Sequence, residues 1–360
     1  MIDFTDTLSA ISGPVQTTRV SKLKGEVSTR TYYRVELTSR PGAPSALVIM
    51  QLPEPFGPGT PAHAQALAFI DVRDYLARAG IPVPALYGSA LERGQLVLED
   101  LGDLTFEARL RRDGLGSWPL AYARALDQLA DLHARGEPPQ PSAACIAFRR
   151  RYDAALLRSE LDHFREWGLE AVRGALPADA RAELDAHFDA LTREIVALRD
   201  GFVHRDYQSR NLMWSPAPAS AAVSDEQRLV VIDFQDAFIG PAPYDLVALL
   251  CDSYVELDYP TQRGLLERYA ARRGFDAARS AELTRGFDLI TLQRKLKDAG
   301  RFVFIDRVRN NADFLQFFTP SLRHVARALD RQSEWQPLAA FLRRWLPGFP
   351  EVPAPSPAAH

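Results

Sequence analysis

The first third of the chain has a pattern of apolar and polar residues with a period of two, which is typical of β-strands. Within residues 15–51, the segment 31–37 alternates in this way and the segment 46–50 is a short apolar run. Residues 95–99 repeat the strand pattern, whereas residues 62–79 have the composition of a helix. The first hundred residues are therefore predicted to form a small antiparallel sheet with one helix.

Beyond the turn-rich segment 100–103, the pattern becomes helical. Leu126, Leu129 and Leu132 show the helical spacing in a predicted helix over 119–134. Further helices are predicted over 151–167, 178–198, 244–255, 260–272, 279–309 and 321–345, and short strands near 212–214 and 229–233. The fold class that follows is α+β: a two-lobed protein-kinase-like fold with a small antiparallel-sheet N-terminal lobe and a larger, mainly helical C-terminal lobe.

The predicted domain boundary lies in the same turn-rich segment. Residues 1–101 are expected to form a nucleotide-binding lobe with a hinge at its end, and residues 102–346 a catalytic and substrate-binding lobe. Residues 347–360 contain five prolines and are expected to form a disordered tail.

Composition narrows the class of protein without indicating a reaction. Hydrophobic residues make up 46% of the chain and charged residues 25%, which are ordinary values for a soluble globular protein. A net charge of −3 gives no reason to expect nucleic acid or an anionic membrane as a partner. The two cysteines are too few for a disulfide framework, and no apolar run reaches the length of a membrane span. We expect a cytoplasmic protein that is monomeric and has no obligate protein partner.

The segment 202–213 carries the most specific motif. Asp206 is followed five residues later by Asn211, and Asp233 comes directly after the apolar strand 229–232. The form H-x-D-x-x-x-x-N, with a second aspartate at a strand end, is the layout of a kinase catalytic loop and its metal ligands. It predicts Asp206 as the general base, and Asn211 and Asp233 as ligands of Mg²⁺. His204 and Asp245 are predicted to support the loop, Asp245 by bracing it or by capping a helix.

The nucleotide phosphates need hydrogen-bond donors, but the chain has neither a P-loop nor a G-x-G-x-x-G motif. In the turn 24–30, Ser28, Thr29 and Arg30 are the candidate phosphate contacts, although an ordinary hairpin would also suit these residues. The backbone at Glu99 and Leu101 is expected to contact adenine, because we expect this segment to be an edge strand with unpaired donors and acceptors.

One expected part is missing. A kinase carries a lysine near the end of its third strand, where this chain has Met50 and Gln51. Either another cation such as Arg30 substitutes for that lysine, or nucleotide binding is weak or lost.

These motifs carry a family resemblance. Residues 204–213 and 232–246 resemble the aminoglycoside phosphotransferase family, and residues 28–34, 98–102 and 287–297 are similar to its bacterial N-acetylmuramate/N-acetylglucosamine anomeric kinases of cell-wall recycling. That group also lacks the usual strand lysine. The resemblance implies phosphorylation, with ATP and Mg²⁺ as cofactors, of the C1 hydroxyl of N-acetylmuramate and/or N-acetylglucosamine. The sugar 1-phosphate would feed UDP-sugar synthesis in peptidoglycan recycling.

The predicted sugar site uses a basic helix face after residue 287. This face includes Arg301, and its basic groups suit an anionic ligand such as the lactyl carboxylate of muramate. The predicted substrate contacts are Trp167, Arg210, Gln293, Arg294 and Lys297. A solvated helix face is the other interpretation of this pattern.

Two further functions stay open at this point. An antibiotic phosphotransferase for polycationic aminoglycosides would need a carboxylate-rich pocket, which the basic face disfavours. A nucleotide-binding pseudokinase is the non-catalytic alternative, and Met50 in place of lysine is the reason to consider it.

Overall fold

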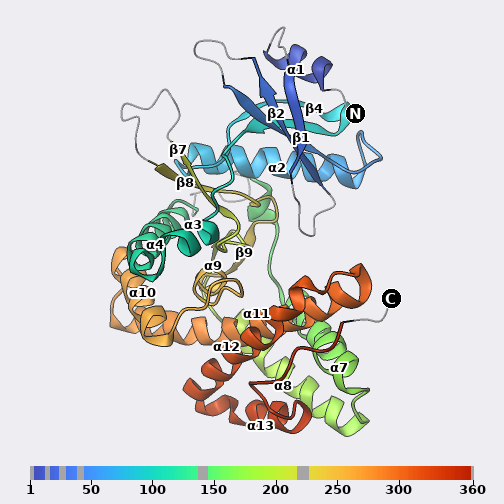
Figure 1. Ribbon diagram of the computed structural model, residues 1–360. Coiled ribbons are helices and arrows are strands. Elements are labelled where there is room, and N and C mark those ends of the chain that lie inside the picture. The colour runs from blue at the N-terminus through green and yellow to red at the C-terminus, as the bar shows by residue number, and fades with distance from the viewer. Residues whose placement is uncertain are drawn as a thin grey trace. The chain divides into compact units, whose positions relative to one another are not determined.

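The computed structural model describes residues 4–12, 17–23, 30–38, 44–136, 145–216 and 227–357 (Figure 1). The chain divides into two compact units: residues 1–118, 138–148 and 210–237 form the first, and the remainder forms the second. The units do not follow the predicted boundary after residue 101, because two later segments of the chain belong to the first unit.

The first unit is built on a five-stranded antiparallel sheet with the order β1-β2-β3-β5-β4. Its strands are β1 Thr17–Lys22, β2 Thr31–Leu37, β3 Ala46–Gln51, β4 Leu86–Ala90 and β5 Gln95–Glu99. Alternate residues of β2 point to opposite faces, so Val35 faces the apolar core while Arg34 lies on the other face. One face packs on helix α1, Thr5–Ser12, through Phe4 and Leu8.

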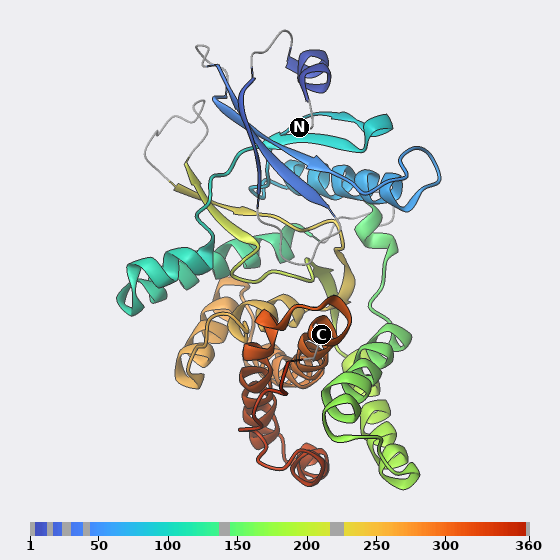
Figure 2. The ribbon, with the colours of Figure 1, turned by 45° about the vertical axis from the view of Figure 1, so that its right-hand side comes forward.

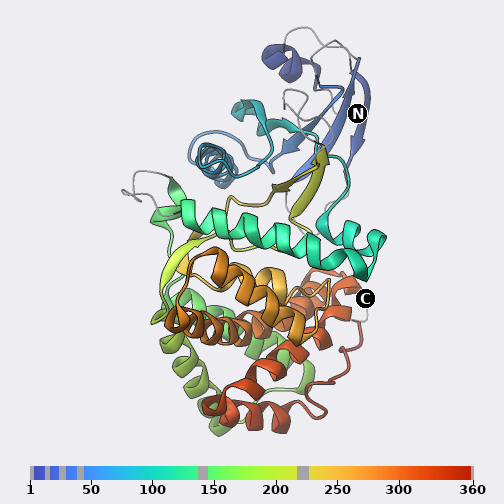
Figure 3. The same ribbon diagram turned by 90° about the vertical axis from the view of Figure 1, so that its left-hand side faces the viewer.

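Helix α2, Pro61–Arg78, runs beside the sheet in all three ribbon views (Figures 1–3). Thr60 caps its N-terminus by accepting a hydrogen bond from the backbone of His63. The first unit also contains helix α3, Phe106–Asp113, and a hairpin of β7, Leu212–Pro216, with β8, Gln227–Val231. Phe69 of α2 packs against Phe234, which follows that hairpin, with the ring centres 4.9 Å apart and the rings tilted.

The second unit is organised around helix α11, Ala277–Arg309, which is 33 residues long and is largely buried in its middle section. The other helices of this unit are α4 Trp118–Arg135, α6 Ala154–His163, α7 Ala171–Arg173, α8 Ala178–Val196, α9 Tyr244–Leu250, α10 Tyr259–Arg272, α12 Phe318–Arg331 and α13 Gln336–Trp345. A two-stranded sheet pairs β6, Asp200–Val203, with β9, Phe238–Pro241. None of the helices within the described ranges is long and apolar enough to cross a membrane.

A π-helix, Phe164–Glu170, continues directly from α6 and packs on α11. The contact is close because Gly300 of α11 has no side chain. A Cβ at this position would lie 2.8 Å from the Cα atom of Phe164 and 2.9 Å from the carbonyl oxygen of His163. Since π-helices are rare and often mark functional sites, this segment is a candidate for a functional role.

The predicted fold class is confirmed, and most predicted helices and strands appear within a few residues of their expected bounds. The helix predicted over 321–345 is in fact two helices, α12 and α13. Sequence reasoning missed α1, α3 and the sheet of β6 and β9.

The prediction of a disordered tail is wrong for residues 347–357. Val352 is fully buried, and its carbonyl oxygen accepts a hydrogen bond from Thr319 at 2.6 Å. Glu351 pairs with Arg323 at 2.7 Å, and the carbonyl oxygen of Ser356 accepts from Arg307 at 3.0 Å. Proline-rich composition suggested disorder, but one buried valine and several side-chain contacts hold the segment on the second unit.

Candidate active site

The loop that carries Asp206 begins directly after β6 in the second unit and is held by a buried carboxylate. Asp245, at the start of α9, is fully buried and accepts hydrogen bonds from the backbone N–H groups of His204 at 2.7 Å and Arg205 at 2.9 Å. A second buried contact joins Asp245 to His133 at 3.1 Å, and His133 lies 2.7 Å from the hydroxyl of Tyr269. Asp245 thus connects the loop to two helices.

The other end of this loop is held in the same way. Asp252 is buried and accepts a hydrogen bond from the backbone N–H of Ser209 at 2.8 Å. Within the loop, the backbone N–H of Asp206 donates to Nδ1 of His204 at 3.2 Å. Two buried carboxylates and one imidazole therefore fix the backbone on both sides of Asp206.

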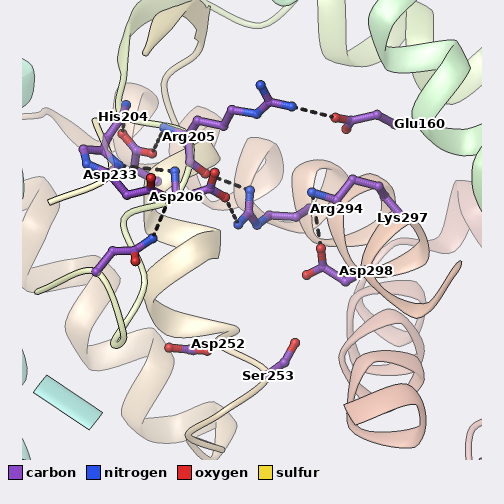
Figure 4. A network of polar contacts seen from close by, with 12 residues as sticks. Glu160, His204, Arg205, Asp206, Asp233, Asp252, Ser253, Arg294, Lys297 and Asp298 are labelled. Atoms are coloured by element: carbon purple, nitrogen blue, oxygen red, sulfur yellow. Dashed lines mark hydrogen bonds and ion pairs between the residues drawn. The ribbon is translucent and has the colours of Figure 1, made fainter. Parts of the chain in front are cut away.

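Arg205 adopts a left-handed backbone conformation with φ of 84°, which is uncommon for a residue with a side chain and marks strain. Its carbonyl oxygen accepts a hydrogen bond from Arg294 at 2.8 Å, and its guanidinium lies 3.7 Å from Glu160 (Figure 4). The N–H of Arg205 donates to Asp245. Contacts at the N–H, the carbonyl oxygen and the guanidinium of Arg205 therefore hold this backbone conformation.

Arg294 also pairs with the carboxylate of Asp206 at 3.1 Å, as Figure 4 shows. Its side chain is only 4% exposed and lies over the ring of Tyr244 at 4.8 Å, whereas the side chain of Asp206 is 34% exposed. Burial would raise the pKa of Asp206, but the positive charges of Arg294, Lys297 and Arg205 hold this pKa below its ordinary value. Asp206 is therefore ionised and oriented.

Two residues of α11 that we predicted as substrate contacts are buried and contact other protein groups. Arg294 was predicted to bind substrate, but it is buried and its guanidinium contacts the loop and Asp206. Gln293 is fully buried and donates to Glu160 at 2.9 Å, and Tyr152 donates to the same carboxylate. Both predictions treated α11 as one exposed basic face, whereas the first turn of this face packs against the catalytic loop.

Three further residues were predicted to contact the substrate. Lys297 is 17% exposed and pairs with Asp298 at 3.3 Å. Trp167, on the π-helix, packs edge-on against Phe304 of α11 with ring centres 5.2 Å apart. Arg210 belongs to the first unit, where its guanidinium pairs with Glu107 at 2.7 Å.

In the first unit, Asp233 follows β8 and also has a left-handed backbone, with φ of 63°. The amide nitrogen of Asn211 lies 3.5 Å from its carboxylate, and Gln235 donates to it at 2.9 Å. Its side chain is 43% exposed. A carboxylate and an amide side by side fit Mg²⁺, which prefers hard oxygen ligands and keeps several waters. A half-turn of the Asn211 amide would exchange its nitrogen for its oxygen.

Arg30 lies 3.8 Å from Asp233, and its side chain is 12% exposed. Burial and then the charge of Asp233 raise the pKa of Tyr32, whereas Arg30 acts in the opposite direction. Met50 is buried, and the amide nitrogen of Gln51 donates to the carbonyl oxygen of Arg93 at 2.9 Å. Arg30 thus supplies the cation beside Asp233 that neither residue at the end of β3 provides.

The predicted adenine contacts need one correction. β5 is an interior strand between β3 and β4, not an edge strand. The backbone N–H of Glu99 donates to the carbonyl oxygen of Ala85 at 2.9 Å, and the carboxylate of Glu99 pairs with Arg228. Leu101, which lies beyond β5, stays a predicted backbone contact. Ser28 and Thr29 lie outside the described residues.

Comparisons with known proteins fit this arrangement of residues. Residues 19–283 match the phosphotransferase enzyme family, which covers the sheet, the catalytic loop and the first turns of α11. The chain belongs to this family.

This phosphotransferase is 31% identical over 344 residues to an N-acetylmuramate/N-acetylglucosamine kinase of Pseudomonas aeruginosa, and the match covers 92% of this chain and 89% of that protein. It is 30% identical over 275 residues to a kinase of the same name from Caulobacter vibrioides, covering 71% and 73% of the two chains.

Its fold resembles a solved aminoglycoside phosphotransferase with ADP bound, with a TM-score of 0.56, 13% identity and coverage of 91% and 97% of the two chains. A choline/ethanolamine kinase family protein from Mesorhizobium loti gives a TM-score of 0.52 at 15% identity, covering 94% and 95%. At these identities the likeness concerns the fold alone.

Two contributors to the site of this phosphotransferase were not predicted. Asp252 lies just beyond the end of α9, so helical spacing from Asp245 does not reveal its contact with the loop. Tyr152 is remote in sequence from the motif and acts through Glu160, so no local pattern reveals it.

Proposed function

We propose that this phosphotransferase transfers the γ-phosphoryl group of ATP to the C1 hydroxyl of N-acetylmuramate and/or N-acetylglucosamine. The names of its relatives support the acceptor, and the aspartate on a fixed loop supports the reaction. The observation that carries the proposal is that Arg294 contacts both the carboxylate of Asp206 and the carbonyl oxygen of Arg205. These contacts keep the base ionised and in place.

In the proposed reaction, the C1 oxygen attacks the γ-phosphorus in line with the leaving oxygen. The new bond joins that oxygen to phosphorus, and the bond that breaks joins phosphorus to the β-phosphate of ATP. Asp206 receives the proton of the sugar hydroxyl and later releases it to water. The products are the sugar 1-phosphate, ADP and a proton.

The lowered pKa of Asp206 decides how strongly it acts as a base. A carboxylate held by arginine is a weak proton acceptor, so it is suited to orienting the hydroxyl and accepting the proton late in the reaction. A loose phosphoryl-transfer transition state needs little nucleophile activation. In addition, an anomeric hydroxyl is more acidic than an ordinary alcohol.

The nucleotide and metal contacts are proposed from the first unit. Asn211 and Asp233 would hold Mg²⁺, which neutralises charge on the phosphates. Arg30 would take the place of the strand lysine and contact the phosphates, since it already lies beside Asp233. Leu101 would bind adenine through its backbone.

The test is a turnover assay with ATP and Mg²⁺ on N-acetylmuramate, N-acetylglucosamine and kanamycin, with the product examined by ³¹P NMR. We expect a phosphate coupled to the anomeric proton for at least one sugar and none for kanamycin. A product phosphorylated at another hydroxyl would contradict the C1 assignment. ATP-dependent modification of kanamycin alone would favour the antibiotic phosphotransferase, and no product with any acceptor would favour the pseudokinase.

A further inference from the structure

Arg301 of α11 stands out among the cations near the catalytic loop because it has no acidic partner in the described ranges. Arg294, Lys297 and Arg205 each lie near a carboxylate. Arg301 is partly buried, and its guanidinium lies over the ring of Phe304, 5.0 Å from the ring centre. A guanidinium that is partly withdrawn from water and has no counter-ion is well suited to bind an anion.

The surroundings of Arg301 form an aromatic cluster, defined here as His163, Trp167 and Phe304. His163 and Trp167 lie 5.3 and 5.2 Å from Phe304 between ring centres. The π-helix carries Trp167, and the missing side chain at Gly300 lets this helix approach α11 closely. Nε2 of His163 is buried and has no hydrogen-bond partner among the described residues.

The charges around this cluster are unbalanced. Burial, and then the positive charges of Arg309 and Arg205, lower the pKa of Arg301. Burial, Arg301 and Lys297 likewise lower the pKa of His163, although Glu166 and Glu160 act in the opposite direction. The nearby carboxylates do not neutralise Arg301, because Glu160 accepts from Gln293 and Tyr152, and Asp298 pairs with Lys295 at 2.9 Å. An anionic ligand would balance this excess.

Arg301 and Phe304 are also on the same face of α11 as Arg294, which contacts the base. Lys297, Arg301 and Phe304 follow Arg294 by three, seven and ten residues, which places all four on one side of α11. Arg301 is seven residues from Arg294, or about 10 Å along the helix axis. A sugar ring with a side substituent spans such a distance, so an acceptor whose hydroxyl is at Asp206 can reach Arg301.

We infer that Arg301 and the aromatic cluster form a subsite for a carboxylate carried by the acceptor, and that Arg301 selects N-acetylmuramate over N-acetylglucosamine. This inference rests on the proposed function. The two sugars differ only by the lactyl ether of muramate, which carries the carboxylate. The guanidinium binds that carboxylate, and Trp167 or Phe304 packs against its methyl group or the sugar ring.

The test compares kcat/KM for the two sugars, at saturating ATP and Mg²⁺, in the wild type, Arg301→Gln and Arg301→Lys. We expect Arg301→Gln to lower kcat/KM for N-acetylmuramate about 10- to 100-fold through KM, which is the effect of losing one charged hydrogen bond. The value for N-acetylglucosamine should change less than about twofold, and Arg301→Lys should recover part of the loss. Arg309→Gln removes the same charge from an exposed site near the same ring, and it should leave the ratio of the two values within about twofold.

Calorimetric binding of each sugar, without turnover, separates this inference from the proposed function. If the wild type phosphorylates neither sugar, the proposed function fails, but weaker N-acetylmuramate binding by Arg301→Gln would still support the subsite. Equal losses for both sugars, or no loss for either, would overturn the inference, provided that the thermal unfolding midpoint shows a folded variant.

Discussion

Two residues in left-handed backbone conformations, Arg205 and Asp233, stand beside the predicted chemistry, and their surroundings differ. Arg205 is fixed at its N–H by Asp245, at its carbonyl by Arg294 and near its guanidinium by Glu160. The side chain of Asp233 is 43% exposed. Its carboxylate accepts a hydrogen bond from Gln235 and lies farther from the guanidinium of Arg30. Asn211 lies at the limit of hydrogen-bond distance.

We infer from this difference that the two groups of residues are prepared for ligands in different ways. The loop that carries the base is held by buried protein groups, so its geometry exists before any ligand binds, which is the condition for preorganised catalysis. The carboxylate of Asp233 is partly exposed, so we expect the bound nucleotide and ion to fix its position. Three predictions test this comparison, and a fourth concerns stability.

The largest effect is expected for Asp206→Asn. The amide cannot accept the proton and does not attract Arg294 as a charge, so kcat should fall about 10³-fold or more. Steady-state kinetics with saturating sugar and ATP measures this. Asp200→Asn, which changes an exposed aspartate paired with Arg151, is the matched control and should keep nearly full activity. Full activity of Asp206→Asn would remove the assigned base.

Arg294→Met should come next, with a loss in kcat of about 10²-fold, because a base that is no longer oriented loses effective positioning. The pKa of Asp206 is held low by Arg294, so it should rise in the variant, and the acidic limb of the pH–kcat profile should move to higher pH. A variant with lower kcat but an unmoved acidic limb would show that Arg294 acts through the loop backbone alone.

Arg30→Gln tests the proposed phosphate contact of the first unit. It should mainly raise KM for ATP, by about tenfold, because one charged contact to the phosphates is lost. KM for the sugar should change little. Arg30→Lys should be intermediate, since it keeps the charge without the fork of donors. If KM for ATP stays constant in both variants, Arg30 is not the substitute for the missing lysine.

The smallest effect concerns stability and pH. Burial, Lys295 and Arg327 hold the pKa of His324 well below its ordinary value, so the folded protein keeps this imidazole neutral. The unfolded chain takes up a proton below about pH 6.5, so its free energy falls and the folded state loses up to about 1.4 kcal/mol per pH unit. Urea unfolding between pH 7.5 and 5.5 should show a shallower decline for His324→Gln. An unchanged slope would assign the effect to other groups.

The sequence was most informative where function requires a fixed local spacing. Asp206, Asn211 and Asp233 stand out because a catalytic loop tolerates few arrangements, and the strands were visible because β2 and β3 have clear alternation and apolar runs. Short elements such as α3 were missed because eight residues give too little periodicity.

Contacts between distant segments could not be read in advance. Arg294 and Gln293 lie on a helix whose sequence shows charge but not which turn is buried, so both were assigned to the substrate. The π-helix depends on the fit between Gly300 and Phe164, two residues that are 136 positions apart. Arg30 was one of two options from the sequence and stays a prediction, because its proximity to Asp233 depends on the fold of the first unit.

The packed segment after α13 has a practical consequence. A shortened protein that stops at the last helix would lose Val352 and uncover the apolar surface that this side chain fills on the second unit. Such a protein would be prone to self-association even though every catalytic group is present. Affinity tags and fusion partners are better joined after residue 357, or at the other end of the chain.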